Sequence, residues 1–175
     1  MTIEHEHPRV DPTRTRMTVA GERVAGFTYG TLVTLSMVIA GAKLYPDGPG
    51  QIAVFVVLTT LALWLAHVYA HTIGQSVSHG RRVQLAELRH IARREGAIVE
   101  AALPPVVPLL LAALGVLSAQ LAIWAAFGLG LVVLAVQGVQ YARIERLGRL
   151  QTVAAVAGNV GVGLILVAVK LVLVH

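Results

Sequence analysis

Two histidines, His67 and His71, stand four residues apart in a long apolar segment of this 175-residue chain. Residues at i and i+4 lie on one face of a helix, one turn apart. Because a histidine side chain gains or loses a proton near neutral pH, such a pair can relay protons or gate a path. Glu100, in the next apolar segment, can exchange protons or attract cations in the same way. The sequence therefore predicts a proton or cation path that includes these three residues.

Other polar residues interrupt the apolar segments. Counted at about 1.5 Å per residue, the deepest of them lie in the same half of the membrane as His67, and the other half is nearly pure Leu, Val, Ala and Ile. We expect the following residues to belong to this polar layer: Tyr29, Thr28, Thr31, Gln137 and Asn159. The alternative is a structural role, because polar side chains also join packed helices by hydrogen bonds in a membrane.

An intramembrane metal or haem site is a further interpretation. Two histidines one turn apart can hold a metal ion, and Glu100 is the third ligand that the sequence offers. The pair lacks the glutamate of the HExxH metalloprotease motif. Haem ligation normally uses histidines on facing helices, and the apolar segments after residue 96 contain no histidine. We therefore expect no cofactor and no metal, with His67, His71 and Glu100 kept as the candidate ligands.

The composition excludes several classes of protein. Charged residues make up 13% of the chain and hydrophobic residues 56%, whereas a soluble domain carries about 25% charged residues. The absence of cysteine excludes disulfides, thiolate metal sites and cysteine nucleophiles. The sequence has no GxSxG motif and no glycine-rich phosphate loop, so we expect no enzyme. The net charge of +5 is explained by membrane topology, and nothing indicates binding of nucleic acid.

Five apolar segments approach the roughly 20 residues that cross a bilayer as a helix. They cover residues 24–44, 51–74, 97–117, 120–141 and 151–173. Prolines at positions 104, 105 and 108 should kink the third segment, because proline removes a backbone hydrogen bond. We predict an all-α fold, a bundle of five transmembrane helices over residues 23–175 in the cell inner (plasma) membrane. Its expected partners are the lipid bilayer, a small cation or proton, and further copies of the chain.

The arginines predict the orientation of this bundle. Twelve of the 14 Lys and Arg residues fall on one side of a five-span arrangement. The positive-inside rule then makes the N-terminus cytoplasmic and places the C-terminus outside. Residues 1–22 are polar, and we expect a disordered tail. Residues 78–96 predict an amphipathic helix on the inner surface or an extension of the third span.

The start of the first apolar segment, Arg-Val-Ala-Gly-Phe-Thr-Tyr-Gly over residues 23–30, resembles a known signature. The lysosomal potassium channel family and its bacterial relatives open their first helix with Arg-x-x-x-Phe-Ser-Asp-Gly. The matching positions are Arg23, Phe27, Thr28 in place of serine, and Gly30, with Tyr29 in place of the aspartate. The second segment, in which Trp64 is followed by His67, is similar to that family's next helix.

This resemblance implies a tetrameric cation pore lined by the first helix, with an apolar constriction at Leu32, Leu35 and Ile39. The family's bacterial members have six helices per chain, against five predicted for this one. In composition the whole chain also looks like small multi-pass membrane proteins of actinobacterial type.

Three functions follow from these patterns and stay open at this point. The first is a proton- or cation-conducting channel or transporter that uses an intramembrane layer of histidine and glutamate. The alternative is a membrane scaffold or accessory subunit without transport, whose polar residues are structural. The third is the intramembrane metal or haem-binding protein. Ion flux that depends on His67 would distinguish the first from the other two.

Overall fold

The computed structural model describes residues 12–173 and, among them, the side chains of residues 21, 23–169 and 172. Over this range the chain forms helices and turns and no strand, so the predicted all-α class is confirmed. The helices of this range are α1 (Pro12–Leu44), α2 (Pro49–His79), α3 (Leu85–Glu95), α4 (Ala97–Glu100), α5 (Leu103–Ala113), α6 (Ala119–Ile144) and α7 (Arg149–Leu173).

Four of these helices are long and apolar enough to cross a membrane: α1 from Arg23 onward, α2, α6 and α7. The third predicted crossing differs from the others because it is divided among α3, α4 and α5. The segments Leu85–Glu100 and Leu103–Ala113 meet at an angle of 55°. The described chain therefore carries four candidate crossings, or five if this bent pair counts as one. The predicted number of five requires the bent pair to cross.

The break in the third segment lies at Ala101 and Ala102, with one residue between the break and Pro104 and Pro105. Proline has no N–H, and it restricts the residue before it, so a helix is interrupted on its N-terminal side. The same residue suits the first turn of a new helix, where N–H groups have no intrahelical partner. Helix α5 accordingly begins at Leu103, and the predicted kink is confirmed.

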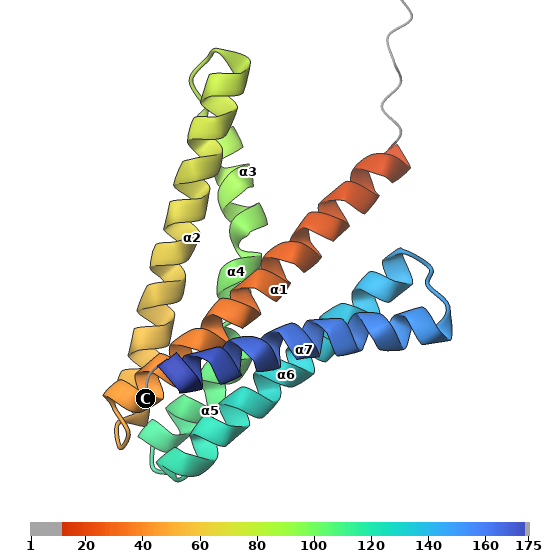
Figure 1. Cartoon of the computed structure of the whole chain (residues 1–175). Coiled ribbons are helices and arrows are strands. Elements are labelled where there is room, and N and C mark those ends of the chain that lie inside the picture. Colours follow the sequence, from red (N-terminus) through yellow and green to blue (C-terminus); the bar gives the residue numbers. More distant parts are fainter. Residues whose placement is uncertain (1–11, 174–175) are drawn as a thin grey trace, which may run out of the picture.

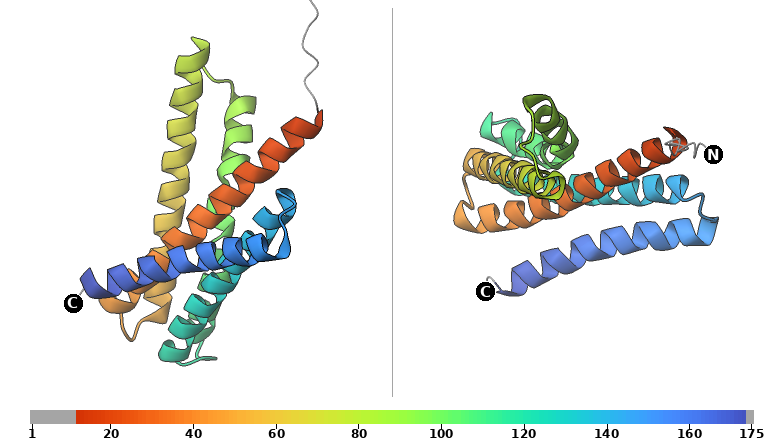
Figure 2. Two further views of the ribbon diagram at one scale, coloured as in Figure 1. Left: turned by 45° about the vertical axis from the view of Figure 1, so that its right-hand side comes forward. Right: turned by 90° about the horizontal axis from the view of Figure 1, so that it is seen from above.

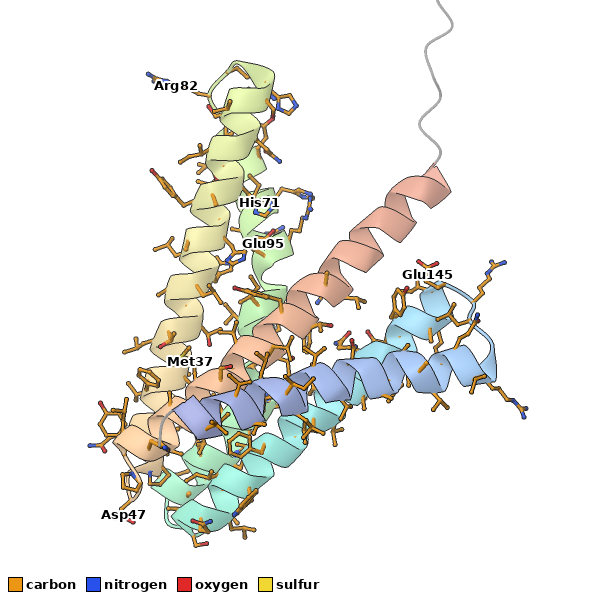
Figure 3. The ribbon with its side chains drawn as sticks, viewed as in Figure 1. Met37, Asp47, His71, Arg82, Glu95 and Glu145 are labelled. Atoms are coloured by element: carbon orange, nitrogen blue, oxygen red, sulfur yellow. The ribbon has the colours of Figure 1, made fainter. Side chains whose placement is uncertain are left out.

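The helices converge at one end and spread apart at the other (Figures 1 and 2). The α1–α2 loop, the α5–α6 loop and the end of α7 lie at the converging end. The start of α1, the α2–α3 turn and the α6–α7 turn lie at the spread ends, with Arg82 and Glu145 at two of the tips in Figure 3. All the arginines of the described range therefore belong to the spread ends or to the helical segments that lead there.

The connector at 78–96 contains the turn of a helical hairpin formed by α2 and α3. Helix α2 continues to His79, and Gly80 ends it in the left-handed conformation, with φ of 60°. Helix α3 then returns along α2, and its Ile91 is buried. The side chain of Trp64 on α2 donates a hydrogen bond to the carbonyl of Ala92 at 3.0 Å. The segment is thus helical over Leu85–Glu95, and its place on the inner surface or as an extension of the third span stays a prediction.

Helix α1 begins within the segment that we expected to be a tail. Helix α1 begins at Pro12, so residues 12–22, which we expected to belong to a disordered tail, are helical. Residues 1–11 of the expected tail lie outside the described range.

The apolar core lies toward the converging end, where α1, α2, α5 and α6 meet. Its buried members include Val38, Ile52, Val56, Leu109 and Ala126. Glycines bring the helices close together elsewhere: a Cβ on Gly30 of α1 would lie 2.8 Å from the carbonyl oxygen of Ile98 on α4. A Cβ on Gly138 of α6 would lie 2.7 Å from the Cα of Val156 on α7. These close approaches fix α1 and α7 against the bundle.

Candidate functional site

The predicted pair of His67 and His71 lies on the face of α2 that meets α1 and α3. The ring of His67 lies 5.4 Å from the ring of Tyr29 on α1, at an angle of 49° between the planes. His71, one turn further toward the hairpin, lies 3.6 Å from the carboxylate of Glu95 on α3, measured from Nδ1 to Oε1. Figure 3 shows the side chains of His71 and Glu95 between the two helices. We call these four residues, Tyr29, His67, His71 and Glu95, the histidine string.

Hydrogen bonds to the backbone orient both imidazole rings. Nδ1 of His67 donates to the carbonyl oxygen of Leu63 at 3.0 Å, and Nδ1 of His71 donates to the carbonyl oxygen of His67 at 3.2 Å. A carbonyl oxygen can only accept, so Nδ1 carries the proton in these bonds and Nε2 is left to exchange one. The side chain of Glu95 is only 11% exposed. This nearly buried carboxylate thus faces Nδ1 of His71.

Glu95 was not singled out from the sequence. Helices α2 and α3 run antiparallel on either side of the turn at residues 80–84. His71 and Glu95 are each twelve positions from Val83, so a hairpin centred there places them opposite each other. The signal that could have found Glu95 was therefore this symmetry, once the connector is read as a hairpin.

Glu100 lies away from the histidines and forms an ion pair with Arg23 of α1 at 2.9 Å. The two side chains are 66% and 47% exposed. Among residues 12–173, no three His, Asp or Glu side chains are gathered closely enough to hold a metal ion. The candidate ligand set of His67, His71 and Glu100 is therefore not assembled.

Two cavities flank α1 at the spread end of the bundle. The first, the α1–α7 cavity, has a volume of about 620 Å³. Four residues predicted from the sequence line this cavity, namely Thr28, Tyr29, Leu32 and Asn159. Tyr141 of α6 and Glu145, directly after α6, line it as well. Through Tyr29 this cavity adjoins the histidine string.

The second, the α1–α6 cavity, has a volume of about 610 Å³ and lies between α1, α4 and α6. Its polar lining consists of Arg23, Glu100, Gln137, Gln140 and Arg143. Gln137 is 6% exposed, and its Oε1 has no hydrogen-bond partner among the described residues. The two cavities share Val24 and Ile144, whose side chains lie between them.

The remaining predicted residues have local partners or lie in the core. Thr31 is buried and donates a hydrogen bond to the carbonyl of Phe27 at 2.9 Å. Asn159 of α7 donates to the carbonyl of Leu134 on α6 at 3.4 Å, which joins two helices. Leu35 and Ile39 are buried within the single chain, and Leu32 is partly buried at the α1–α7 cavity. Their role as a pore constriction stays a prediction.

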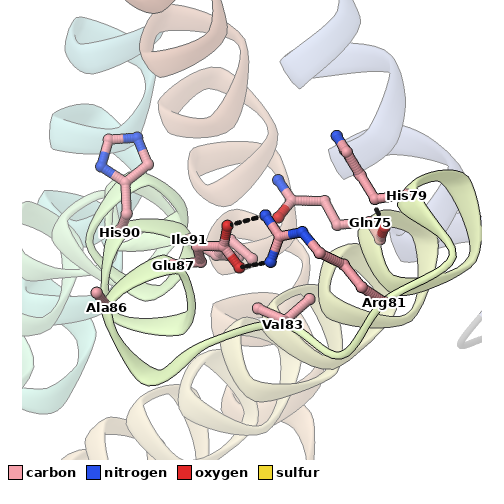
Figure 4. Close-up of a pocket in the computed structure, with 8 residues that line it drawn as sticks. All are labelled: Gln75, His79, Arg81, Val83, Ala86, Glu87, His90 and Ile91. Carbon is pink, nitrogen blue, oxygen red and sulfur yellow. Dashed lines mark hydrogen bonds and ion pairs between the residues drawn. The ribbon is translucent and has the colours of Figure 1, made fainter.

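A third cavity, of about 440 Å³, lies in the α2–α3 hairpin (Figure 4). The guanidinium of Arg81 donates two hydrogen bonds to the carboxylate of Glu87, at 3.1 and 2.5 Å. These bonds, and a further one from the backbone N–H of Gln84, lower the pKa of Glu87 to about 2. The same contact raises the pKa of Arg81. Both groups stay charged at neutral pH, and their ion pair joins the start of α3 to the turn before it.

Comparison with known proteins adds no relative: no protein-family model, no curated protein and no solved structure matches this chain.

Proposed function

We propose that this chain is a cell-membrane protein that conducts protons or small cations, and that the histidine string is the part of it that handles the proton. The observation that carries the proposal is the contact of His71 with Glu95, continued along α2 by His67 and Tyr29. Ionisable groups inside a membrane protein are rare, and they commonly mark proton relays or ion pathways.

The string supports a relay with simple chemistry. A hydronium ion gives a proton to Nε2 of His71, which leaves water and an imidazolium whose charge is balanced by the Glu95 carboxylate beside Nδ1. Nε2 of this imidazolium then passes the proton through water to Nε2 of His67, and His71 returns to its neutral form. Water next receives the proton from His67, which becomes neutral in turn. The relay leads from the arginine-bearing end of the bundle into its interior.

The other half of α2 carries no comparable groups. Apart from Gln51 in the first turn, its polar side chains there are Thr59 and Thr60, which donate hydrogen bonds to carbonyls one turn earlier in the same helix. In our proposal this apolar half closes the path, and conduction requires its transient hydration. A pore formed by several copies of the chain, with Leu32, Leu35 and Ile39 at its narrowest part, is the form of this closure that the family resemblance suggests.

The alternative is a membrane scaffold or accessory subunit that transports nothing. It is favoured by the bond from Asn159 to the carbonyl of Leu134 and by the close glycine contacts at Gly30 and Gly138. In this alternative the polar residues hold the helices together, and the spread ends of the bundle bind a partner protein.

Flux measurements in proteoliposomes test the proposal. Proton and potassium gradients are applied separately to the wild-type chain and to three variants: His67→Gln, Glu95→Gln and His90→Gln. His90 is an exposed histidine of α3 outside the histidine string, so it is the matched control. We expect proton flux in the wild type, a decrease of about tenfold or more in the first two variants, and no change in His90→Gln.

Each other result has a distinct meaning. Potassium flux that is insensitive to His67→Gln would indicate a cation path that does not use the histidine string. No flux above that of empty liposomes, from protein shown to be folded and inserted, would contradict the proposal and favour the scaffold.

A further inference from the structure

We infer that the α1–α6 cavity binds one anionic phospholipid of the leaflet at the arginine-bearing end. The phosphate would lie between Arg23 and Arg143, the glycerol ester region at Gln137 and Gln140, and an acyl chain along the valines below them. The inference is independent of transport, since it concerns residues outside the histidine string.

The order of side chains along α6 carries the inference. Val133, Val136, Gln140 and Arg143 follow one another at intervals of three or four residues on one face of the helix. Ten residues separate the first from the last, which is about 15 Å along the helix axis. Along this distance the lining changes from apolar to amide to guanidinium. A phospholipid changes in the same order, from acyl chain to ester carbonyls to phosphate.

The charge at the mouth of the cavity favours an anion. It carries the guanidinium groups of Arg23 and Arg143 and the carboxylate of Glu100, an excess of one positive charge. The carboxylate of Glu100 already forms an ion pair with Arg23. Within the described part of the chain, no acidic side chain forms an ion pair with Arg143. A guanidinium binds phosphate oxygens through paired, charge-assisted hydrogen bonds.

The buried amide of Gln137 is a second and independent sign of a ligand. Its Oε1 has no partner among the described residues, and the residue is only 6% exposed. A buried polar group without a partner is costly, so native structures rarely leave one unsatisfied. Gln137 lies about 9 Å further into the bundle than Arg143, six residues away along the same helix. Oε1 accepts hydrogen bonds, as ester oxygens also do, so its donor would be a water molecule that a bound lipid holds beside its ester carbonyls at that depth.

The apolar part of the cavity distinguishes a lipid from a free phosphate. Phe27 and Val24 of α1 face Val133 and Val136 of α6 across it. A small hydrophilic anion would leave these walls without a partner, whereas an acyl chain covers them. Lipid is also the molecule present at the highest concentration beside a membrane helix.

Lipid binding to the full chain in a neutral detergent tests the inference. Phosphatidylglycerol and phosphatidylcholine with identical acyl chains are titrated separately, and retained lipid is counted by native mass spectrometry. We expect one phosphatidylglycerol per chain, bound about tenfold more tightly than phosphatidylcholine. Arg143→Gln should weaken this binding about tenfold, and Gln137→Leu should weaken it as well.

Arg149→Gln is the matched control, because Arg149 lies at the same end of the bundle and does not line the cavity. Equal losses in Arg143→Gln and Arg149→Gln would reduce the effect to general surface charge and overturn the inference. Equal retention of the two lipids would overturn it too. Release of phosphatidylglycerol by inorganic phosphate would show a site for free phosphate instead of a lipid.

Discussion

Arg23 of α1 and Glu100 of α4 form an ion pair of 2.9 Å although 77 positions separate them in the chain. The pair closes the gap between the first helix and the broken third segment, where the backbones are already close at Gly30 and Ile98. It also sets one side of the α1–α6 cavity, because both residues line it.

The contribution of this pair to stability should be small. The side chains are 66% and 47% exposed, and exposed ion pairs contribute about 0.2–1 kcal/mol. Unfolding of Arg23→Gln, Glu100→Gln and the double variant in mixed micelles gives the coupling energy directly. We expect a value below about 1 kcal/mol that decreases as salt is added. A coupling of several kcal/mol would mean that the pair is shielded from solvent in the membrane.

Gly30 should not tolerate a methyl group. A Cβ at this position would lie 2.8 Å from the carbonyl oxygen and 2.9 Å from the Cα of Ile98, and a backbone cannot move aside as a side chain can. We expect Gly30→Ala to lower the free energy of unfolding by about 1–3 kcal/mol.

Gly26, one turn earlier on α1, is the control for that substitution. A Cβ there would meet the Cβ of Ala97 at 3.7 Å, which is an ordinary contact. Gly26→Ala should therefore keep or raise stability, by up to about 1 kcal/mol, because alanine favours a helix. Equal losses in the two variants would contradict the close packing of α1 on α4.

Asn159 distinguishes a structural from a transport role for the polar layer. Its side chain donates to the carbonyl of Leu134 at 3.4 Å, and such bonds in membrane proteins average about 0.6 kcal/mol. Asn159→Ala should lower stability by about that amount and leave ion flux unchanged. A loss of flux at unchanged stability would instead assign Asn159 to the path.

The carboxyl of Glu87 should titrate far below its ordinary value of 4.5, because Arg81 donates two hydrogen bonds to it. Its lowered pKa of about 2 means that the pair stabilises the hairpin above about pH 4.5. This stabilisation is lost as the pH falls from 4.5 toward 2. The pH dependence of the Glu87 carboxyl carbon shift measures the pKa directly.

In Arg81→Gln, the pKa of Glu87 should rise toward 4.5, since the largest cause of its lowering is removed. Arg82→Gln, at the neighbouring position, should leave it nearly unchanged. If both variants behaved alike, the cause would be the general charge of the turn and not the hydrogen bonds of Arg81.

The long helices could be predicted from the sequence because a run of apolar residues reports directly on burial in a membrane or a core. The predicted segments 24–44 and 120–141 correspond to parts of α1 and α6. The kink was predictable for a similar reason, since a proline acts on the turn beside it. The start of α1 could not be predicted, because its first turns are polar and lack the apolar pattern that indicates a buried helix.

The contacts of the site were less predictable because they depend on distant parts of the chain. We expected Tyr29 and His67 to share a polar layer, and the structure brings their rings together. The partner of His71 depends on the register of the α2–α3 hairpin, and the partner of Glu100 depends on the packing of α1 against α4. Neither can be predicted from the spacing of nearby residues. Gln137 was selected as a polar residue, but its missing partner became visible only in the packed structure.

The division of the third segment affects how the chain is built during synthesis. Helix α5 has eleven residues, a length of about 16 Å, whereas the hydrocarbon core of a bilayer is about 30 Å thick. It packs mainly against α6 and α2, and α6 follows it in the chain. A nascent chain that ends near residue 118 therefore holds a short, proline-rich segment with only one of its two main neighbours. We therefore expect this segment to reach its packed position only after residues 119–144 have emerged.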